Sequence, residues 1–219
     1  MGPWENGGTV RRVTGRWGHV SDDGAAAVEF ALVALLLFTI LFGIIEFALL
    51  LRDHVSVTSA VRTAARVASS SPGAGPCTPV NGTTCPSSRP PALAQAAADA
   101  VQRSGTAMPK DSIDELWVFK ANAQGFPGTA TSMDTATCTT NCVRFRWVDA
   151  NDRFTYQSGT WDTSRVNACI GSSDAVGVYI KATHRFLTGL FGASIGVSDR
   201  AVMQFEPLPT AQCAPGNHP

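Results

Sequence analysis

One apolar stretch near the N-terminus constrains the fold of this chain more than any other feature. From Phe30 to Leu51 the sequence consists almost entirely of Leu, Ala, Phe and Ile, and Glu46 is its single ionisable residue. A bilayer core about 30 Å thick is crossed by roughly 20 helical residues. The spanning segment must be helical, because lipid offers no partner to backbone N–H and C=O groups. The stretch therefore predicts a transmembrane helix.

The sequence predicts that this helix continues beyond the membrane. Neither Gly nor Pro occurs between Arg52 and Ser70, and small apolar residues recur there at helical spacing. We therefore expect one helix over 25–70, with a transmembrane part at about 30–51 and an amphipathic extension at 52–70. The expected apolar stripe of the extension consists of Val57, Val61, Ala64, Ala65 and Ala68.

All six cysteines follow the apolar stretch, and this indicates a compartment for the larger part of the chain. An even number of cysteines on one side of a membrane is typical of disulfides in an oxidising compartment. Zinc is the rival interpretation, but only one of the close cysteine pairs has a spacing that fits a zinc site. The simplest pairing joins neighbours along the chain: Cys77–Cys85, Cys138–Cys142 and Cys169–Cys213.

The orientation of the helix rests on the cysteines alone. Three arginines precede the apolar stretch and three follow it closely. The usual excess of positive charge on the cytoplasmic side therefore does not decide the orientation of this helix. The cysteines place the N-terminus in the cytoplasm and the C-terminal part outside. We therefore expect a single-pass protein of the plasma membrane.

The rest of the chain predicts a small α+β domain. A Pro/Gly-rich loop at 71–91 precedes an Ala-rich helix at 92–104, which Gly105 ends. Residues 161–169 are ambiguous, with Asp162 or Thr163 as the cap of a short helix. Alternating or β-branched apolar residues predict strands at 113–121, 142–148, 154–157, 175–184 and 194–206. The expected fold class is a membrane-anchored α+β protein, with a small antiparallel sheet and disulfides in an extracytoplasmic domain at 92–219.

Composition and motifs argue against several function classes. The 17 Lys and Arg residues balance 17 Asp and Glu residues, which removes the electrostatic basis for binding nucleic acid. No P-loop, dinucleotide, metallohydrolase or serine-hydrolase motif occurs. Asp149 and Asp152 could suggest calcium, but turn chemistry explains them more simply. The four histidines are dispersed: His19, His54, His184 and His218. We expect no catalytic residue, no cofactor, no metal site and no small-molecule substrate.

The N-terminal edge of the apolar stretch carries a distinct pattern. The run G-A-A-A-V-E-F, Gly24 to Phe30, resembles the processing site of type IV prepilins in the G-x-x-x-x-E-[YF] form of the Flp/Tad branch. The resemblance implies that a membrane-embedded prepilin peptidase cuts after Gly24. Ala25 would then be the first mature residue, and residues 1–24 a cytoplasmic leader. Asp22 and Asp23 depart from the family, in which a basic residue usually stands near the Gly.

A second segment extends the resemblance. The run T-S-A-V-R-T-A-A-R-V-A-S at 58–69 resembles the segment that follows the membrane helix of TadE-like proteins, and 175–207 loosely resembles the close of their ectodomains. The combination resembles a TadE-like pilus assembly protein. It implies a minor pilin or pseudopilin that joins other pilin-like subunits and the Tad machinery in building an adhesive pilus. The alternative is an unprocessed, signal-anchored extracytoplasmic binding domain outside any filament.

Two carboxylates in the apolar helix need a physical reason, because ionisable groups are costly in lipid. Glu29 either pairs with the new N-terminal amine of a neighbouring subunit or extends into the cytoplasmic headgroups. Glu46 either contacts a partner helix or reaches the outer headgroups. Thr39 and Gly43, polar or small on neighbouring turns, would let another helix approach closely.

Overall fold

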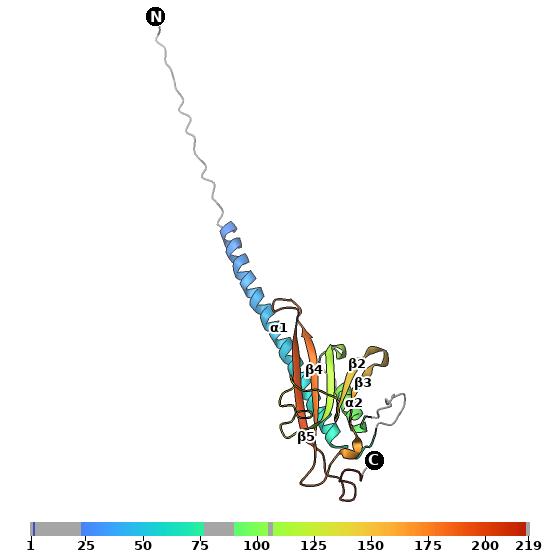
Figure 1. The fold of residues 1–219 in the computed structure, drawn as a ribbon. Helices are drawn as coiled ribbons and strands as arrows, with labels where there is room; N and C mark the ends of the chain where they lie inside the picture. The colour runs from blue at the N-terminus through green and yellow to red at the C-terminus, as the bar shows by residue number, and fades with distance from the viewer. Residues whose placement is uncertain (1, 3–22, 77–89, 105–106, 218–219) are drawn as a thin grey trace. The chain divides into compact units, whose positions relative to one another are not determined.

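The computed structural model describes residue 2 and residues 23–76, 90–104 and 107–217. Within these ranges the chain forms helix α1 (Asp23–Ser69), helix α2 (Ala92–Ser104) and a five-stranded sheet (Figure 1). The chain divides into two compact units, and the boundary between them falls between Phe42 and Gly43 in the sequence. The first contains the N-terminal part of α1, and the second contains the rest of α1 with the ectodomain. Each unit is described by itself.

Helix α1 begins and ends close to the predicted bounds. It is long and apolar enough to cross a membrane, and no helix breaker interrupts it after Gly24 apart from Gly43. In the first unit its large apolar side chains are exposed, with Phe30 at 74% and Leu35 at 68%. Apolar side chains exposed on every side are typical of a helix surrounded by lipid or by other helices. The fold confirms the predicted long N-terminal helix.

In the second unit α1 packs against the sheet. The five residues of the predicted stripe are fully buried, and Ala60 joins them. Helix α2 adds a second row of buried residues, among them Leu93, Ala97 and Val101. Both rows belong to the same core as the strands that follow. Small side chains on both helices allow close packing, so the core consists of two helices on one face of the sheet.

The sheet is antiparallel throughout, in the order β3-β2-β1-β4-β5 (Figure 1). Its strands are β1 (Ile113–Ala121), β2 (Cys142–Val148), β3 (Arg153–Thr160), β4 (Ala175–Arg185) and β5 (Ser194–Gln204). Alternation along each strand divides its side chains between two faces. Leu116 and Val118 of β1 join the core with the helices, whereas Trp117 and Phe119 form a second cluster with Cys138 and Cys142.

The predicted elements agree with the structure in type, and most differ only at their ends. Strand β3 is longer than predicted, because residues 153 and 158–160 extend its pairing with β2. The ambiguous segment contains a short 3-10 helix, Thr163–Arg165, whose cap is the Asp162 carboxylate. Two predicted disulfides form, Cys138–Cys142 and Cys169–Cys213. The predicted Cys77–Cys85 bridge lies outside the described residues.

Candidate functional site

The second unit brings α1 against the connector between β4 and β5, which we define as residues 186–193. The buried stripe of α1 extends toward the N-terminus from Val57 through Asp53, Leu50 and Glu46 to Gly43, in steps of three or four residues. These residues therefore lie on one side of the helix. Gly43 faces the connector, since a Cβ atom placed on it would lie 3.6 Å from Cζ of Phe191.

Glu46 is bound by the connector. Its side chain is only 1% exposed, and its Oε1 atom accepts hydrogen bonds from the backbone N–H and the hydroxyl of Thr188 at 2.5 and 2.8 Å. The second carboxylate oxygen is buried and has no hydrogen-bond partner among the described residues. The carboxylate thus ties residue 188 to a helix position 142 residues earlier in the chain.

A buried hydrogen-bonded pair lies two turns further along α1. The Nδ1 atom of His184, at the end of β4, is 2.6 Å from Oδ2 of Asp53, and both side chains are nearly inaccessible. Arg52 contacts the other carboxylate oxygen of Asp53 at 3.3 Å from its Nη2 atom. The His184 ring stacks edge-on against Phe186, the first residue of the connector. The pair therefore fixes the connector at its base, as Glu46 fixes it near its tip.

Apolar side chains line a groove between α1 and β5. One pocket of about 290 Å³ lies among Glu46, Phe47, Phe186 and Phe191, and a second of about 390 Å³ follows it along the helix. Phe47, Leu50 and Ile195 contribute to both pockets. The two pockets therefore form one continuous apolar surface at this end of the unit.

The other predicted site residues on α1 belong to the first unit. Gly24, Ala25, Glu29 and Phe30 lie in the first two turns of the helix, and all four are exposed. Thr39 donates its hydroxyl to the Leu35 carbonyl at 2.8 Å, a bond within its own helix. The predicted processing residues and the pair Gly43 and Glu46 thus lie in different units.

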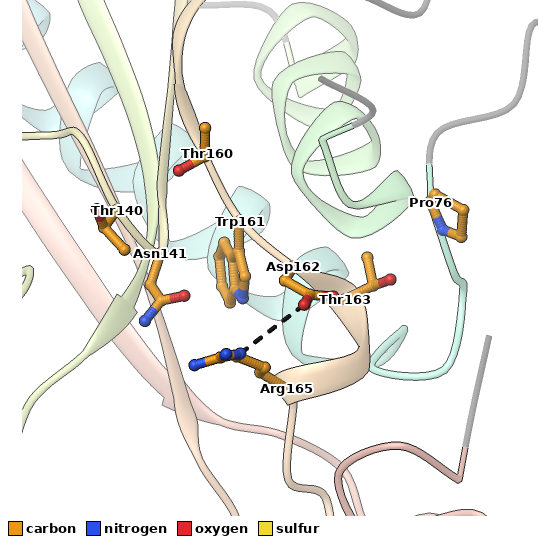
Figure 2. Close-up of a pocket in the computed structure, with 8 residues that line it drawn as sticks. All are labelled: Pro76, Thr140, Asn141, Thr160, Trp161, Asp162, Thr163 and Arg165. Carbon is orange, nitrogen blue, oxygen red and sulfur yellow. Dashed lines mark ion pairs between the residues drawn. The ribbon is translucent and has the colours of Figure 1, made fainter. Parts of the chain in front are cut away.

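A polar pocket of about 560 Å³ lies at the other side of the ectodomain, next to the 3-10 helix (Figure 2). Arg165 and Asp162 form an exposed ion pair at 3.8 Å within one turn of its lining. Hydrogen bonds from the Ser164 hydroxyl and amide lower the pKa of the Asp162 carboxyl. Hydroxyl, amide and indole groups and the Pro76 ring complete the described lining. These groups can hold a polar ligand.

No group of three His, Cys, Asp or Glu side chains that could hold a metal ion occurs within the described ranges. A comparison with known protein families bears on helix α1. Residues 24–66 match the model of the family described as TadE-like protein. This segment is therefore similar to TadE-like proteins. The match begins at the Gly of the predicted cleavage motif and ends within the buried stripe of α1. The chain matches no curated protein and no solved structure.

Sequence reasoning missed the contact of Glu46 with the connector and the contact of Asp53 with the end of β4. A signal existed for the second contact, because His184 follows Ile180 and Ala182 at the spacing of one strand face. Asp53 lies four residues before Val57 and so belongs to the same helix face. A histidine on a buried strand face and an aspartate on a buried helix stripe indicate a polar pair inside the core.

Proposed function

We propose that this chain is a minor pilin or pseudopilin that takes part in the assembly or initiation of a Tad-type adhesive pilus. The match of residues 24–66 to TadE-like proteins carries this proposal, because it begins at the cleavage motif and covers the apolar stretch. In the structure the motif lies on an exposed helix that continues into the ectodomain. The role is structural rather than catalytic.

In the proposed mechanism the leader is removed in the membrane and the mature helix then packs with other subunits. Cleavage after Gly24 exposes the amine of Ala25, and Glu29 follows four residues later, about 6 Å along the helix axis. The amine of a neighbouring subunit pairs with the Glu29 carboxylate, which would otherwise be costly at the bilayer edge. The exposed apolar side chains of residues 30–42 provide the surface for packing between helices.

The proposed orientation places the N-terminus in the cytoplasm and the ectodomain outside. The two disulfides of the ectodomain support it, because disulfides persist in oxidising compartments and are rare in the cytosol. The partners under this proposal are the membrane, a prepilin peptidase and other pilin-like subunits. The ectodomain then faces outward, where it contributes to the surface of the assembled fibre.

The intact mass and N-terminal sequence of the chain extracted from its own membrane test the processing step. We expect a mature chain that begins at Ala25. Replacing Gly24 by Val should block cleavage, whereas Ala26→Val, at a variable position of the motif, should leave it unchanged. A native chain that retains its leader would contradict the proposal and favour an unprocessed signal-anchored domain.

A separate variant tests assembly. Glu29→Gln should still be processed, since the cleavage site is intact, but it should no longer co-purify with the pilin-like subunits. Glu29→Asp should restore part of this association, because it keeps the charge. Normal assembly of the amide variant would remove Glu29 from the mechanism.

A further inference from the structure

We propose that the connector between β4 and β5 inserts its tip into the outer leaflet of the membrane that α1 crosses. The chain would then contact the membrane twice, through α1 and through the connector. This inference rests on the membrane placement of α1, which the proposed function also requires. The partner is lipid, and the residues that meet it are Leu187, Leu190 and Phe191.

The tip exposes large apolar side chains. Leu187 is 75%, Phe191 63% and Leu190 52% exposed, and no charged residue occurs between Phe186 and Ile195. A concentration of exposed leucine and phenylalanine at one hairpin tip is typical of an interaction surface rather than of ordinary solvent-exposed structure. Phenylalanine and leucine without charges suit the boundary between headgroups and acyl chains.

The connector lies beside the part of α1 that belongs to the apolar stretch. It contacts Gly43 and Glu46. At the same level of the helix, Phe47 beside the groove is 68% exposed and Ile44 is 63% exposed. Leu51 adds a further exposed apolar side chain one turn on. Helix and connector thus form one apolar belt at this end of the second unit. A helix that enters lipid here carries the tip into the same layer.

Polar residues follow directly beyond this belt. Arg52 and His54 on α1 are exposed, and so is Arg185 at the base of the connector. Basic side chains next to an inserted apolar segment are favourable, since they reach the phosphate groups of the lipids. The order of apolar tip, then basic residues, then ectodomain matches the order of acyl chains, headgroups and water.

Four backbone N–H groups of the connector have acceptors within the protein. Phe186 donates its N–H to the Ala193 carbonyl, Thr188 to Glu46, Leu190 to the Thr188 hydroxyl and Gly192 to the Gly189 carbonyl. Acyl chains offer no hydrogen-bond acceptor, so an N–H group without a partner in the protein is costly inside the bilayer. Glu46 therefore supplies an acceptor from the helix to the N–H of a residue at the tip. This gives the buried carboxylate a function within its own chain.

Tryptophan fluorescence in vesicles tests the contact. The full chain is reconstituted into vesicles of phosphatidylglycerol and phosphatidylcholine brominated along its acyl chains. Leu187→Trp and Phe191→Trp are each compared with the parent chain, whose five tryptophans give the baseline. Ile170→Trp is the matched control, because Ile170 is 86% exposed and precedes the end of β4 opposite the connector. We expect the added fluorescence to be lost at positions 187 and 191 and kept at position 170.

Flotation of the same vesicles separates the two membrane contacts. A chain that floats but shows no quenching at 187 and 191 overturns the connector contact and leaves the placement of α1 intact. A chain that does not float overturns both. Photo-crosslinking from p-benzoylphenylalanine at position 190 in native membranes identifies the neighbour. A lipid adduct supports the proposal, whereas an adduct to a second copy or to another protein overturns it.

Discussion

The buried hydrogen bond between His184 and Asp53 should stabilise the junction of helix and sheet, and replacing His184 by Ala tests this. The substitution leaves the Asp53 carboxylate buried, with the partly exposed Arg52 as its remaining contact. Removing one partner of a buried pair costs up to about 3–5 kcal/mol, because the buried carboxylate oxygen loses a hydrogen bond that water does not replace. Loss of the imidazole also opens a cavity beside Phe186. We therefore expect a loss in this range rather than the small effect of a surface ion pair.

The expected loss is large enough to measure by chemical unfolding. A urea dependence of about 2 kcal/mol per molar converts 3–5 kcal/mol into a midpoint lowered by roughly 1.5–2.5 M. The assay is urea unfolding of the full chain in detergent, followed by tryptophan fluorescence. Trp117 and Trp161 are buried in the ectodomain and report its unfolding.

A matched variant and a double mutant make the test specific. His54→Ala changes an exposed histidine next to Asp53 and should alter the free energy of unfolding by less than about 0.5 kcal/mol. Adding Asp53→Asn to His184→Ala should cost less than the two single losses combined, because both remove the same contact. A His184→Ala chain as stable as the wild type would refute the reasoning and show that the pair contributes nothing.

Two further predictions concern the ectodomain core. Gly177→Ala should destabilise the core by about 1–3 kcal/mol, because the new Cβ would overlap the Phe119 ring. Gly196→Ala on β5 is the control and should be tolerated, since a Cβ there meets nothing within 4 Å. Thermal unfolding of the two variants measures the difference in stability. Replacing both cysteines of Cys169–Cys213 by Ser should cost more than the same change at Cys138–Cys142. Loop-closure entropy gives about 4 kcal/mol for a separation of 44 residues and about 2 kcal/mol for one of four, and equal losses in urea midpoint would contradict this explanation.

Strands and helices of the ectodomain were predictable because their sequence patterns are local. Alternation in Val143, Phe145 and Trp147 defines β2, and the small residues of the α1 extension define its buried face. The two observed disulfides each join cysteines that are consecutive along the chain. What alternation cannot show is the order of the strands. Strands β1 and β4 pair across the intervening β2–β3 hairpin, and that choice depends on the whole core.

The contacts of Glu46 could not be predicted from the apolar stretch. A buried stripe can be recognised in a helical sequence only where polar residues occupy the opposite face of the helix, as they do after Arg52. Between Gly43 and Leu51 every side of the helix is apolar, so the sequence does not mark the side that the ectodomain covers. An isolated carboxylate there suggested a partner helix or the headgroups. The structure provides a third partner, the Thr188 amide and hydroxyl of the same chain.

This third partner limits how α1 can meet another subunit. From Gly43 to Val57 one side of the helix is occupied by the connector and the sheet, and Glu46 lies on that side. Under the proposed assembly, a second helix that packs along this part of α1 contacts the sides that carry Ile44, Phe47 and Leu51, which remain exposed. Before Gly43 the apolar side chains are exposed on every side, so under the same proposal the register between subunits comes from the N-terminal part. Glu29 is the one carboxylate between the predicted cleavage site and Gly43, and its substitution therefore tests the proposed assembly most directly.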